Sequence, residues 1–401
     1  MKSEKIGHHQ QYCQLKAITN VAAITMEDEK EIIIAQKGNN GIGIVDFFEG
    51  KNILVTGGTG FLAKALIEKM LRTTPKVNKI YLLIRAKDKE AAFHRLKIEI
   101  MESELFKCLE EMHGETYKLF IQNKLIPIVG NIYEPNLGMD IITSDKIAQE
   151  IDLIVDSAAI TTFDERAKLY GWQDTYTFTK AIGEMMINKM RHEIPILIIR
   201  PSIITSSYKE PFPGWMQGFR TIDPLIFFYR KGDLPCLLGD PNGLVDLVPV
   251  DMVVNATMAA MAKHGNLQNP QLNIYHVASS SINPVSFSQI FDYSYNFFKL
   301  FPFVNKKGDK CEAKKMRFFD KILDVENYIW EVLSKQYEVQ DGKEVTKIQI
   351  RLIEKKVEYL KNFSKLYEPY LFYKGWFDND NIRKLMGDMS EEEKRSFEID
   401  A

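Results

Sequence analysis

The segment ILVTGGTGFLAKAL, residues 53–66, decides the expected fold. A short apolar run precedes a glycine-rich turn, and apolar residues then recur with helical spacing. Gly57 permits the tight turn, Gly60 lets the backbone approach a pyrophosphate, and Ala63 lets the helix pack close to the strand. The start of the helix offers N–H groups and the positive end of its dipole to phosphates. The segment therefore predicts a dinucleotide-binding turn; the alternative is a glycine-rich turn that binds nothing.

Further apolar strands alternate with helical segments along the chain. They are expected at KIYLLIRA (79–86), LIPIVGN (125–131), IDLIVDSAA (151–159) and IPILIIRPS (194–202). Continuous apolar strands separated by helices predict an α/β fold, a Rossmann-type doubly wound parallel sheet covered on both faces. Beyond about Pro284 the pattern becomes mostly helical, and Ser390 with Glu393 predicts a capping box. The expected division is an N-terminal extension (1–45), a reductase domain (46–290) and a smaller helical domain (291–401).

Composition excludes several classes of protein. The 401 residues carry a net charge of −2, so nucleic acid is not an expected partner. Four widely spaced cysteines without a CxxC pair indicate reduced thiols, and no metal site is predicted. No apolar run reaches the ~18–20 residues of a transmembrane span. The lysine-containing N-terminus leaves two interpretations open, a plastid transit peptide or a disordered extension.

The end of the second strand favours NADP(H) over NAD(H). An NAD site places an acidic residue there to accept a hydrogen bond from the ribose 2′-OH. This chain has Arg85 instead, with Lys87 close by. A guanidinium binds a 2′-phosphate through charge-assisted hydrogen bonds, whereas a carboxylate would repel it. The alternative is an arginine that is simply exposed at a strand end.

Tyr176 and Lys180 are the candidate catalytic pair. Their spacing of four residues places them on one face of a predicted helix. A nearby ammonium stabilises a phenolate, so such a tyrosine can protonate a carbonyl oxygen as hydride arrives from a nicotinamide. The pair also occurs on ordinary exposed helices, and its context after the glycine turn and the strand ending SAA favours function.

Several long motifs resemble plant fatty acyl-CoA reductases. They include TGGTGFLAKALIEKMLR (56–72), YLLIRAK (81–87), SAAITTFDER (157–166), YGWQDTYTFTKAIGEMM (170–186), IIRPSIITSSYKEPFPGW (198–215) and VPVDMVVNATMAAMAKHG (248–265). The resemblance covers roughly residues 42–397. It implies an extended short-chain dehydrogenase/reductase domain with a C-terminal helical domain. The implied activity is NADPH-dependent reduction of long-chain acyl-CoA to a primary fatty alcohol, with release of CoA.

The resemblance also implies roles for individual residues. Tyr176 is the expected general acid and Lys180 its partner, while the segment 200–202 borders the nicotinamide and YKEPFPGW (208–215) shapes the acyl side. The expected cofactor-binding residues are Thr56, Gly57, Gly58, Thr59, Gly60, Phe61, Leu62, Arg85, Asn131, Ala158, Ala159 and Lys180. The amphiphilic substrate leaves peripheral membrane association open. The expected location is the cytoplasm or the periphery of the endoplasmic reticulum, with the plastid as the alternative if the N-terminal extension is a transit peptide. The oligomeric state is not predicted.

The chain departs from the family between the fourth strand and Tyr176. Only sixteen residues, Ile160 to Thr175, lie there, too few for the helix and the strand with a catalytic Ser or Thr hydroxyl that the family has. The expected junction of this internal deletion is near Arg166–Ala167. The sheet should then be one βα unit short, so strand 194–202 either pairs directly with strand 151–159 or leaves a gap.

Two alternatives to an active acyl-CoA reductase remain. One is a catalytically impaired NADP-binding relative or a truncated gene model, because no Ser or Thr of this chain matches the family's catalytic hydroxyl. The other is an extended reductase acting on a sterol or a sugar nucleotide, which the YKEPFPGW segment and the helical C-terminal region disfavour.

Overall fold

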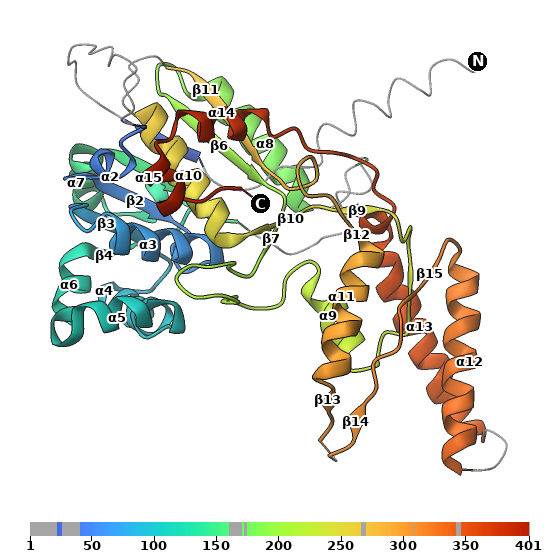
Figure 1. Cartoon of the computed structure of the whole chain (residues 1–401). Helices are drawn as coiled ribbons and strands as arrows, with labels where there is room; N and C mark the ends of the chain where they lie inside the picture. Colours follow the sequence, from blue (N-terminus) through green and yellow to red (C-terminus); the bar gives the residue numbers. More distant parts are fainter. Residues whose placement is uncertain are drawn as a thin grey trace. The chain divides into compact units, whose positions relative to one another are not determined.

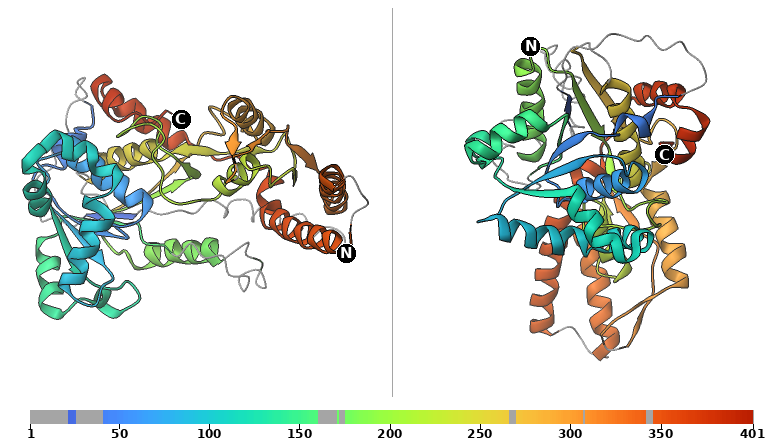
Figure 2. Two further views of the ribbon diagram at one scale, coloured as in Figure 1. Left: turned by 90° about the horizontal axis from the view of Figure 1, so that it is seen from below. Right: turned by 90° about the vertical axis from the view of Figure 1, so that its left-hand side faces the viewer.

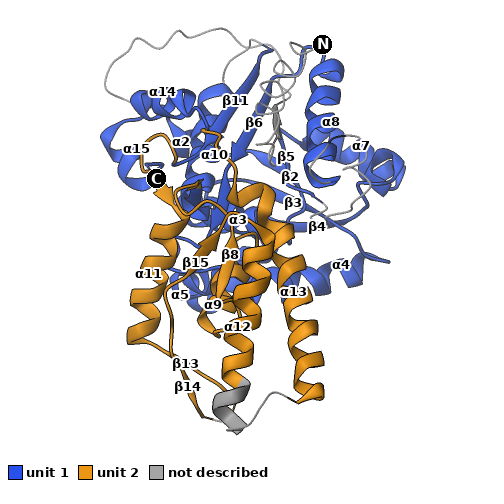
Figure 3. Ribbon diagram, turned by 90° about the vertical axis from the view of Figure 1, so that its right-hand side faces the viewer, with its two compact units in different colours: residues 1–217, 247–279, 377–401 blue, residues 218–246, 280–376 orange. Residues whose placement is uncertain are grey.

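The computed structural model describes residues 22–25, 41–159, 171, 175–265, 270–306, 308–341 and 346–400. The chain forms two compact units, each assembled from separate stretches of sequence (Figure 3). Unit 1 contains residues 1–217, 247–279 and 377–401, and unit 2 contains residues 218–246 and 280–376. The C-terminal segment 377–401 therefore folds with unit 1.

Unit 1 is built around a seven-stranded sheet in the order β11-β6-β1-β5-β2-β3-β4 (Figure 1). Its strands are β1 (Ala22–Thr25), β2 (Asn52–Thr56), β3 (Lys79–Ile84), β4 (Leu125–Val129), β5 (Leu153–Asp156), β6 (Ile196–Pro201) and β11 (Leu272–Val277), with β7 (Ile203–Thr205) and β10 (Leu247–Pro249) pairing separately. Its helices are α2 (Ile44–Phe47), α3 (Phe61–Thr73), α4 (Lys89–Leu96), α5 (Lys107–His113), α6 (Tyr117–Lys124), α7 (Ile141–Glu150), α8 (Thr175–Met190), α10 (Val250–Gly265), α14 (Asp380–Asp388) and α15 (Glu391–Ser396). All five strands expected from the sequence are present, as β2, β3, β4, β5 and β6.

Helices cover both faces of this sheet (Figures 2 and 3). Alternate residues of β2 and β3 point to opposite faces, because side chains in a strand repeat with period two. Ile53 and Val55 belong to the large core that includes residues of α3 and α10, whereas Leu54 belongs to a second core with Ile147 of α7. The continuous apolar strands thus have the double burial that the sequence predicts, and the doubly wound α/β class is confirmed.

Both arrangements expected beside β5, direct pairing with strand 194–202 or an open gap, are wrong. β5 and β6 neither pair directly nor leave an open gap, because β1 lies between them and is antiparallel to both. Ala22 is in register with Asp156 on one side and with Ile198 on the other. Two parallel strands with facing unpaired edges need hydrogen-bond partners, and a segment from the N-terminal region supplies them.

Unit 2 is mostly helical. Its helices are α9 (Asp223–Arg230), α11 (Phe287–Leu300), α12 (Ile322–Asp341) and α13 (Lys347–Leu371), and its short strands are β8 (Cys236–Leu238), β9 (Leu244–Val245), β12 (Val285–Ser286), β13 (Phe303–Val304), β14 (Lys310–Cys311) and β15 (Arg317–Phe319). Capping boxes begin α11 at Ser286 and α13 at Thr346. None of the helices that the structure describes is both long and apolar enough to cross a bilayer.

Candidate active site

The glycine-rich turn between β2 and α3 has the geometry of a phosphate-binding turn. Gly57 has φ +65°, and a Cβ there would lie 2.8 Å from the backbone of Ala158. Only glycine meets both constraints. Gly60 is the N-cap of α3 and has no side-chain cap hydrogen bond, so the start of the helix has room for an anion. The turn fits a pyrophosphate.

The end of β5 is bound to this turn. The amide of Ser157 donates to the carbonyl of Thr56 over 3.3 Å, and the Thr56 hydroxyl donates to the carboxylate of Asp156. The same carboxylate accepts from the amide of Ala158 over 3.3 Å. The structure therefore brings the predicted residues Thr56, Gly57 and Ala158 together at the carboxyl edge of the sheet, where nucleotide sites of this fold class lie.

Arg85 follows β3 and is exposed, as a residue that receives a 2′-phosphate must be. The sequence analysis missed a second arginine beside it, Arg95 of α4. The Arg95 guanidinium donates to the carbonyl of Arg85 over 2.9 Å and lies 3.5 Å from the hydroxyl of Thr59. The sequence did contain one signal for Arg95. Asp88 is a typical N-cap residue, and a helix that begins after Asp88 places Arg95 in its second turn.

Asn131 follows β4 and organises a tight turn. Its side-chain amide donates to Glu134 over 2.9 Å, and its side-chain oxygen accepts from the amide of Tyr133 over 3.2 Å. Its backbone amide also donates to the carbonyl of Leu137. Asn131 thus follows β4 at the carboxyl edge of the sheet, as expected, and its side chain stabilises the turn.

The Tyr176–Lys180 pair lies on α8 as predicted. The Lys180 ammonium is 5.9 Å from the centre of the Tyr176 ring and donates to the carbonyl of Ala158 over 3.2 Å. Burial lowers the pKa of Lys180, and the negative charges of Asp156 and Glu184 oppose that shift. The hydrogen bond to Ala158 holds the pair beside the phosphate turn, although most residues between Ile160 and Asp174, including the predicted junction, lie outside the described part of the chain.

Arg200 connects α8 to the sheet. Its Nε donates to Glu184 over 3.0 Å, its Nη2 forms a second bond to the same carboxylate, and its Nη1 lies 3.1 Å from His276 Nε2. Close by, the hydroxyl of Ser202 is buried and has no hydrogen-bond partner among the described residues. A buried polar atom of this kind is available to a ligand. The 200–202 segment thus both anchors α8 and offers a polar group.

Asp251 of α10 holds the segment 207–215, which contains the YKEPFPGW motif. Its carboxylate accepts hydrogen bonds from the backbone amides of Tyr208, Lys209 and Glu210 at 2.9, 2.8 and 3.0 Å. At the other end of the segment, the Trp215 amide donates to the Ser207 hydroxyl over 2.9 Å. Asp251 is a residue whose role the sequence analysis did not identify.

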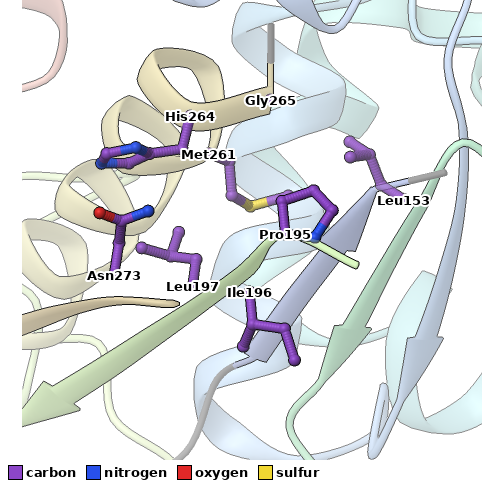
Figure 4. Close-up of a pocket in the computed structure, with 8 residues that line it drawn as sticks. All are labelled: Leu153, Pro195, Ile196, Leu197, Met261, His264, Gly265 and Asn273. Carbon is purple, nitrogen blue, oxygen red and sulfur yellow. The ribbon is translucent and has the colours of Figure 1, made fainter. Parts of the chain in front are cut away.

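A small pocket lies at the opposite, amino edge of the sheet (Figure 4). It is lined by residues at the starts of β5, β6 and β11 and at the end of α10: Leu153, Pro195, Ile196, Leu197, Met261, His264, Gly265 and Asn273. Its volume of about 20 Å³ has room for about one water molecule. This pocket is too small for a nucleotide and lies away from the predicted site.

Comparison with known proteins shows the family of this chain. The family described as "Male sterility protein" matches residues 55–168 and 164–257, which together span half of the chain. A relative from Arabidopsis thaliana, "Fatty acyl-CoA reductase 2, chloroplastic", is 39% identical over 90% of this chain and 76% of its own length. This chain belongs to the fatty acyl-CoA reductase family. It is therefore an oxidoreductase with a nicotinamide dinucleotide-binding fold.

Two further relatives and one solved structure extend the comparison. "Alcohol-forming fatty acyl-CoA reductase" from Simmondsia chinensis is 30% identical over 85% of this chain and 90% of its own length. "Putative fatty acyl-CoA reductase 7" from Arabidopsis thaliana is 35% identical over 85% of this chain and 90% of its own length. The terminal R domain of the myxalamid pathway has a TM-score of 0.57 at 17% identity, covering 84% of this chain and 85% of that domain. That likeness shows a common fold.

The comparisons also confirm the internal deletion. The family match breaks into two segments that meet at residues 164–168, where the sequence predicts the junction. The alignment with the chloroplastic relative runs over 470 positions, whereas 90% of this chain is only about 361 residues. More than a hundred aligned positions therefore have no residue here. The alignment with the putative reductase 7 runs over only 378 positions, whereas 85% of this chain is about 341 residues, so far fewer aligned positions lack a residue in that comparison.

Proposed function

We propose that this protein reduces long-chain fatty acyl-CoA to the primary alcohol, with NADPH as the electron donor and CoA released as the thiol. The observation that carries the proposal is the hydrogen bond from Lys180 to the carbonyl of Ala158. It joins the Tyr–Lys pair to the phosphate turn despite the shortened connection between them. Named relatives that reduce acyl-CoA support the substrate class.

The residues present fit NADPH. The Gly57–Gly60 turn and the start of α3 would hold the pyrophosphate, and the exposed Arg85 together with Arg95 would hold the 2′-phosphate. Ala158 and Ala159 would border the adenosine ribose, with Asn131 near the adenine. Lys180 would bind the nicotinamide ribose, and the buried Ser202 hydroxyl is available at that end. The exposed Arg85 guanidinium favours NADPH over NADH by charge-assisted hydrogen bonding, whereas Arg95, whose Nε and Nη2 donate to Glu99 at 2.6 and 3.0 Å, would have to exchange that carboxylate for the phosphate.

Tyr176 would act at the carbonyl oxygen. A bound nicotinamide supplies the hydride that reaches the carbonyl carbon, once at the thioester and once at the aldehyde. In the first reduction the Tyr176 hydroxyl stabilises the negative charge that develops on oxygen; the carbonyl then reforms as the carbon–sulfur bond breaks, and the CoA thiolate takes up a proton from solvent. In the second reduction Tyr176 donates its proton to the alkoxide and is reprotonated from solvent. The Lys180 ammonium, 5.9 Å from the centre of the Tyr176 ring, would supply the positive charge beside the phenol.

Product analysis tests this function. The whole chain is incubated with NADPH and C16–C30 acyl-CoA, and primary alcohols are measured by gas chromatography beside the Tyr176→Phe variant. Alcohol from the wild type and its loss in the variant support the proposal. No alcohol from a wild type that still binds NADPH would contradict it.

The second candidate function is cofactor binding without turnover. The resemblance implies that the missing segment contains the strand with a catalytic Ser or Thr, and the loss of that strand favours this second function. Sequencing the transcript across the codons for Arg166 and Ala167 separates a real deletion from an error in the gene model. Recovered in-frame coding sequence at that position would show that the natural protein is longer than this chain.

We propose a plastid location, supported by the name of the chloroplastic relative. Because β1 begins at Ala22, a cleaved leader must end before that residue if the mature sheet is to keep all seven strands. A fluorescent fusion of the whole chain, followed by N-terminal sequencing of the mature protein, tests both points. Fluorescence confined to the cytoplasm or the endoplasmic reticulum would contradict the proposal.

A further inference from the structure

Helix α11 in unit 2 has two apolar faces. Its inner face contains Phe287, Phe291 and Phe298, all buried. The Phe291 ring packs edge-on against Tyr229 of α9, with ring centres 5.3 Å apart. The outer face contains Tyr293, Phe297 and Leu300, spaced by four and three residues. The exposed apolar stripe lies opposite the face that packs in the core, so it is not needed for folding. Exposed apolar stripes of this kind mark interaction surfaces.

Helix α11 runs into the β13–β14 hairpin (Figure 1), and exposed apolar residues follow the helix in sequence. We call the exposed apolar set the α11 tip: Tyr293, Phe297, Leu300, Phe301 and Val304, each between 51% and 75% exposed. The rings of Phe297 and Phe301 lie 5.0 Å apart. The Arg230 guanidinium lies 6.0 Å from the ring of Phe303, next to the tip. The α11 tip is thus an exposed apolar surface that includes a packed aromatic pair.

Lysines are frequent in the sequence that includes and follows the α11 tip. Residues 293–317 contain seven lysines or arginines and two acids, although the whole chain has a net charge of −2. Lys299, Lys306 and Lys310 are exposed, and none of them forms a salt bridge within the described part of the chain. Their ammonium groups therefore remain available for an external anion.

From this arrangement we infer that the α11 tip binds the surface of an anionic lipid bilayer. Aromatic and aliphatic side chains enter the interface of a bilayer, while surrounding lysines bind anionic headgroups. A second copy of the chain is a poorer partner, because two like-charged tips would repel each other in a two-fold dimer. The inference does not depend on the proposed reaction, although a bilayer is where long-chain amphiphilic substrates would accumulate.

Vesicle binding tests this inference. The whole chain is sedimented with vesicles of phosphatidylcholine containing phosphatidylglycerol, and separately with vesicles of phosphatidylcholine alone. We expect binding to the anionic vesicles that weakens with added salt. The double variant Leu300→Ser/Phe301→Ser should lower that affinity roughly tenfold, since two partly inserted side chains contribute somewhat more than 1 kcal/mol. Lys299→Gln/Lys310→Gln should lower it by about tenfold or more, at ~1 kcal/mol per lysine.

The matched control is Ile348→Ser/Leu352→Ser on α13. Ile348 is 73% exposed and Leu300 is 75% exposed, in the same unit, so the control removes similar apolar surface away from the α11 tip. The control should bind vesicles like the wild type, and all variants should keep the wild-type thermal midpoint. Equal losses in control and tip variants, or no binding by the wild type, would overturn the inference. So would a dimer in sedimentation velocity that Leu300→Ser/Phe301→Ser dissociates, because the tip would then be a self-association surface.

Discussion

Trp215 stacks on Phe61, with ring centres 5.0 Å apart and an angle of 23° between the ring planes. Phe61 is the first residue of α3, directly after the phosphate turn, and Trp215 ends the YKEPFPGW segment. On the same helix, Lys69 and Arg72 form ion pairs with Glu210 of that segment. The segment expected to shape the acyl side is therefore attached to the helix that begins at the cofactor turn.

Because Trp215 stacks on Phe61 at the start of α3, we predict that Trp215→Leu weakens NADPH binding, although Trp215 is not one of the residues expected to contact the nucleotide. Loss of an aromatic pair is worth about 1 kcal/mol, or roughly fivefold in Kd, as measured by NADPH fluorescence titration. Trp330→Leu, a half-exposed tryptophan of α12, is the control and should leave Kd unchanged. An unchanged Kd in Trp215→Leu would show that the segment and the turn are independent.

Arg85 and Arg95 should distinguish NADPH from NADH. Arg85→Ala should raise the Kd for NADPH by roughly 10- to 100-fold, because hydrogen bonds to a charged phosphate are worth about 1.5–3 kcal/mol. Arg95→Ala should raise it by less, because the phosphate must displace Glu99 from Arg95. The Kd for NADH, which lacks the 2′-phosphate, should change little. Arg383→Ala, an exposed arginine of α14, is the control. A parallel loss of NADH affinity would mean that these arginines stabilise the turn rather than read the phosphate.

His264 should make stability depend on pH. Burial, and the nearby charge of Lys263, lower its pKa to about 4, and its Nε2 lies 2.7 Å from the Tyr275 hydroxyl. The unfolded chain has the ordinary value near 6.5, so between these two values it binds more protons than the folded chain. Stability is therefore fully present above pH ~6.5 and is lost as the pH falls toward 4.

Urea unfolding at a series of pH values measures this loss. Allowing for partial exposure, we expect the wild type to lose about 1–2 kcal/mol between pH 7 and pH 5 through His264. His264→Gln should flatten that part of the profile, whereas His94→Gln, at an exposed histidine, should not. Identical profiles for the wild type and His264→Gln would contradict the assignment.

The strand β1 predicts different effects for two nearby truncations. Removal of residues 1–21 keeps β1, and removal of residues 1–25 deletes it and leaves the facing edges of β5 and β6 unpaired. Net backbone hydrogen bonds contribute about 0.5–1.5 kcal/mol each, so the second truncation should cost about 2 kcal/mol or more. Thermal unfolding of both chains measures the difference. Equal midpoints would contradict a structural role for β1.

The parts of the fold that sequence predicts are those with local causes. The phosphate turn follows from Gly57 between an apolar strand and an amphipathic helix, and the capping box at Ser390 follows from its spacing to Glu393. The structure adds that Glu393 also accepts hydrogen bonds from the amides of Ile42 and Gly43, some 350 residues earlier. No local pattern shows a contact of that kind.

The unpredicted features depend on where distant segments meet. β1 was missed because its four residues pair only with the edges that the deletion exposes. Asp251 looked like an ordinary acidic residue near the start of a helix, and its three bonds to the 208–210 backbone appear only in the folded chain. Predicting the role of Arg95 requires the direction of α4 as well as its sequence. The sequence shows the chemical type of each of these residues but not the residues with which they interact.

The central claim is that the Tyr176–Lys180 pair is positioned for two successive reductions of a thioester. The direct test follows NADPH oxidation and free CoA thiol together with C16 acyl-CoA as substrate. The account predicts about two NADPH oxidised per thiol released for the wild type. It also predicts loss of both signals in Tyr176→Phe, with the Kd for NADPH retained. No thiol release from the wild type, or wild-type rates in Tyr176→Phe, would contradict it.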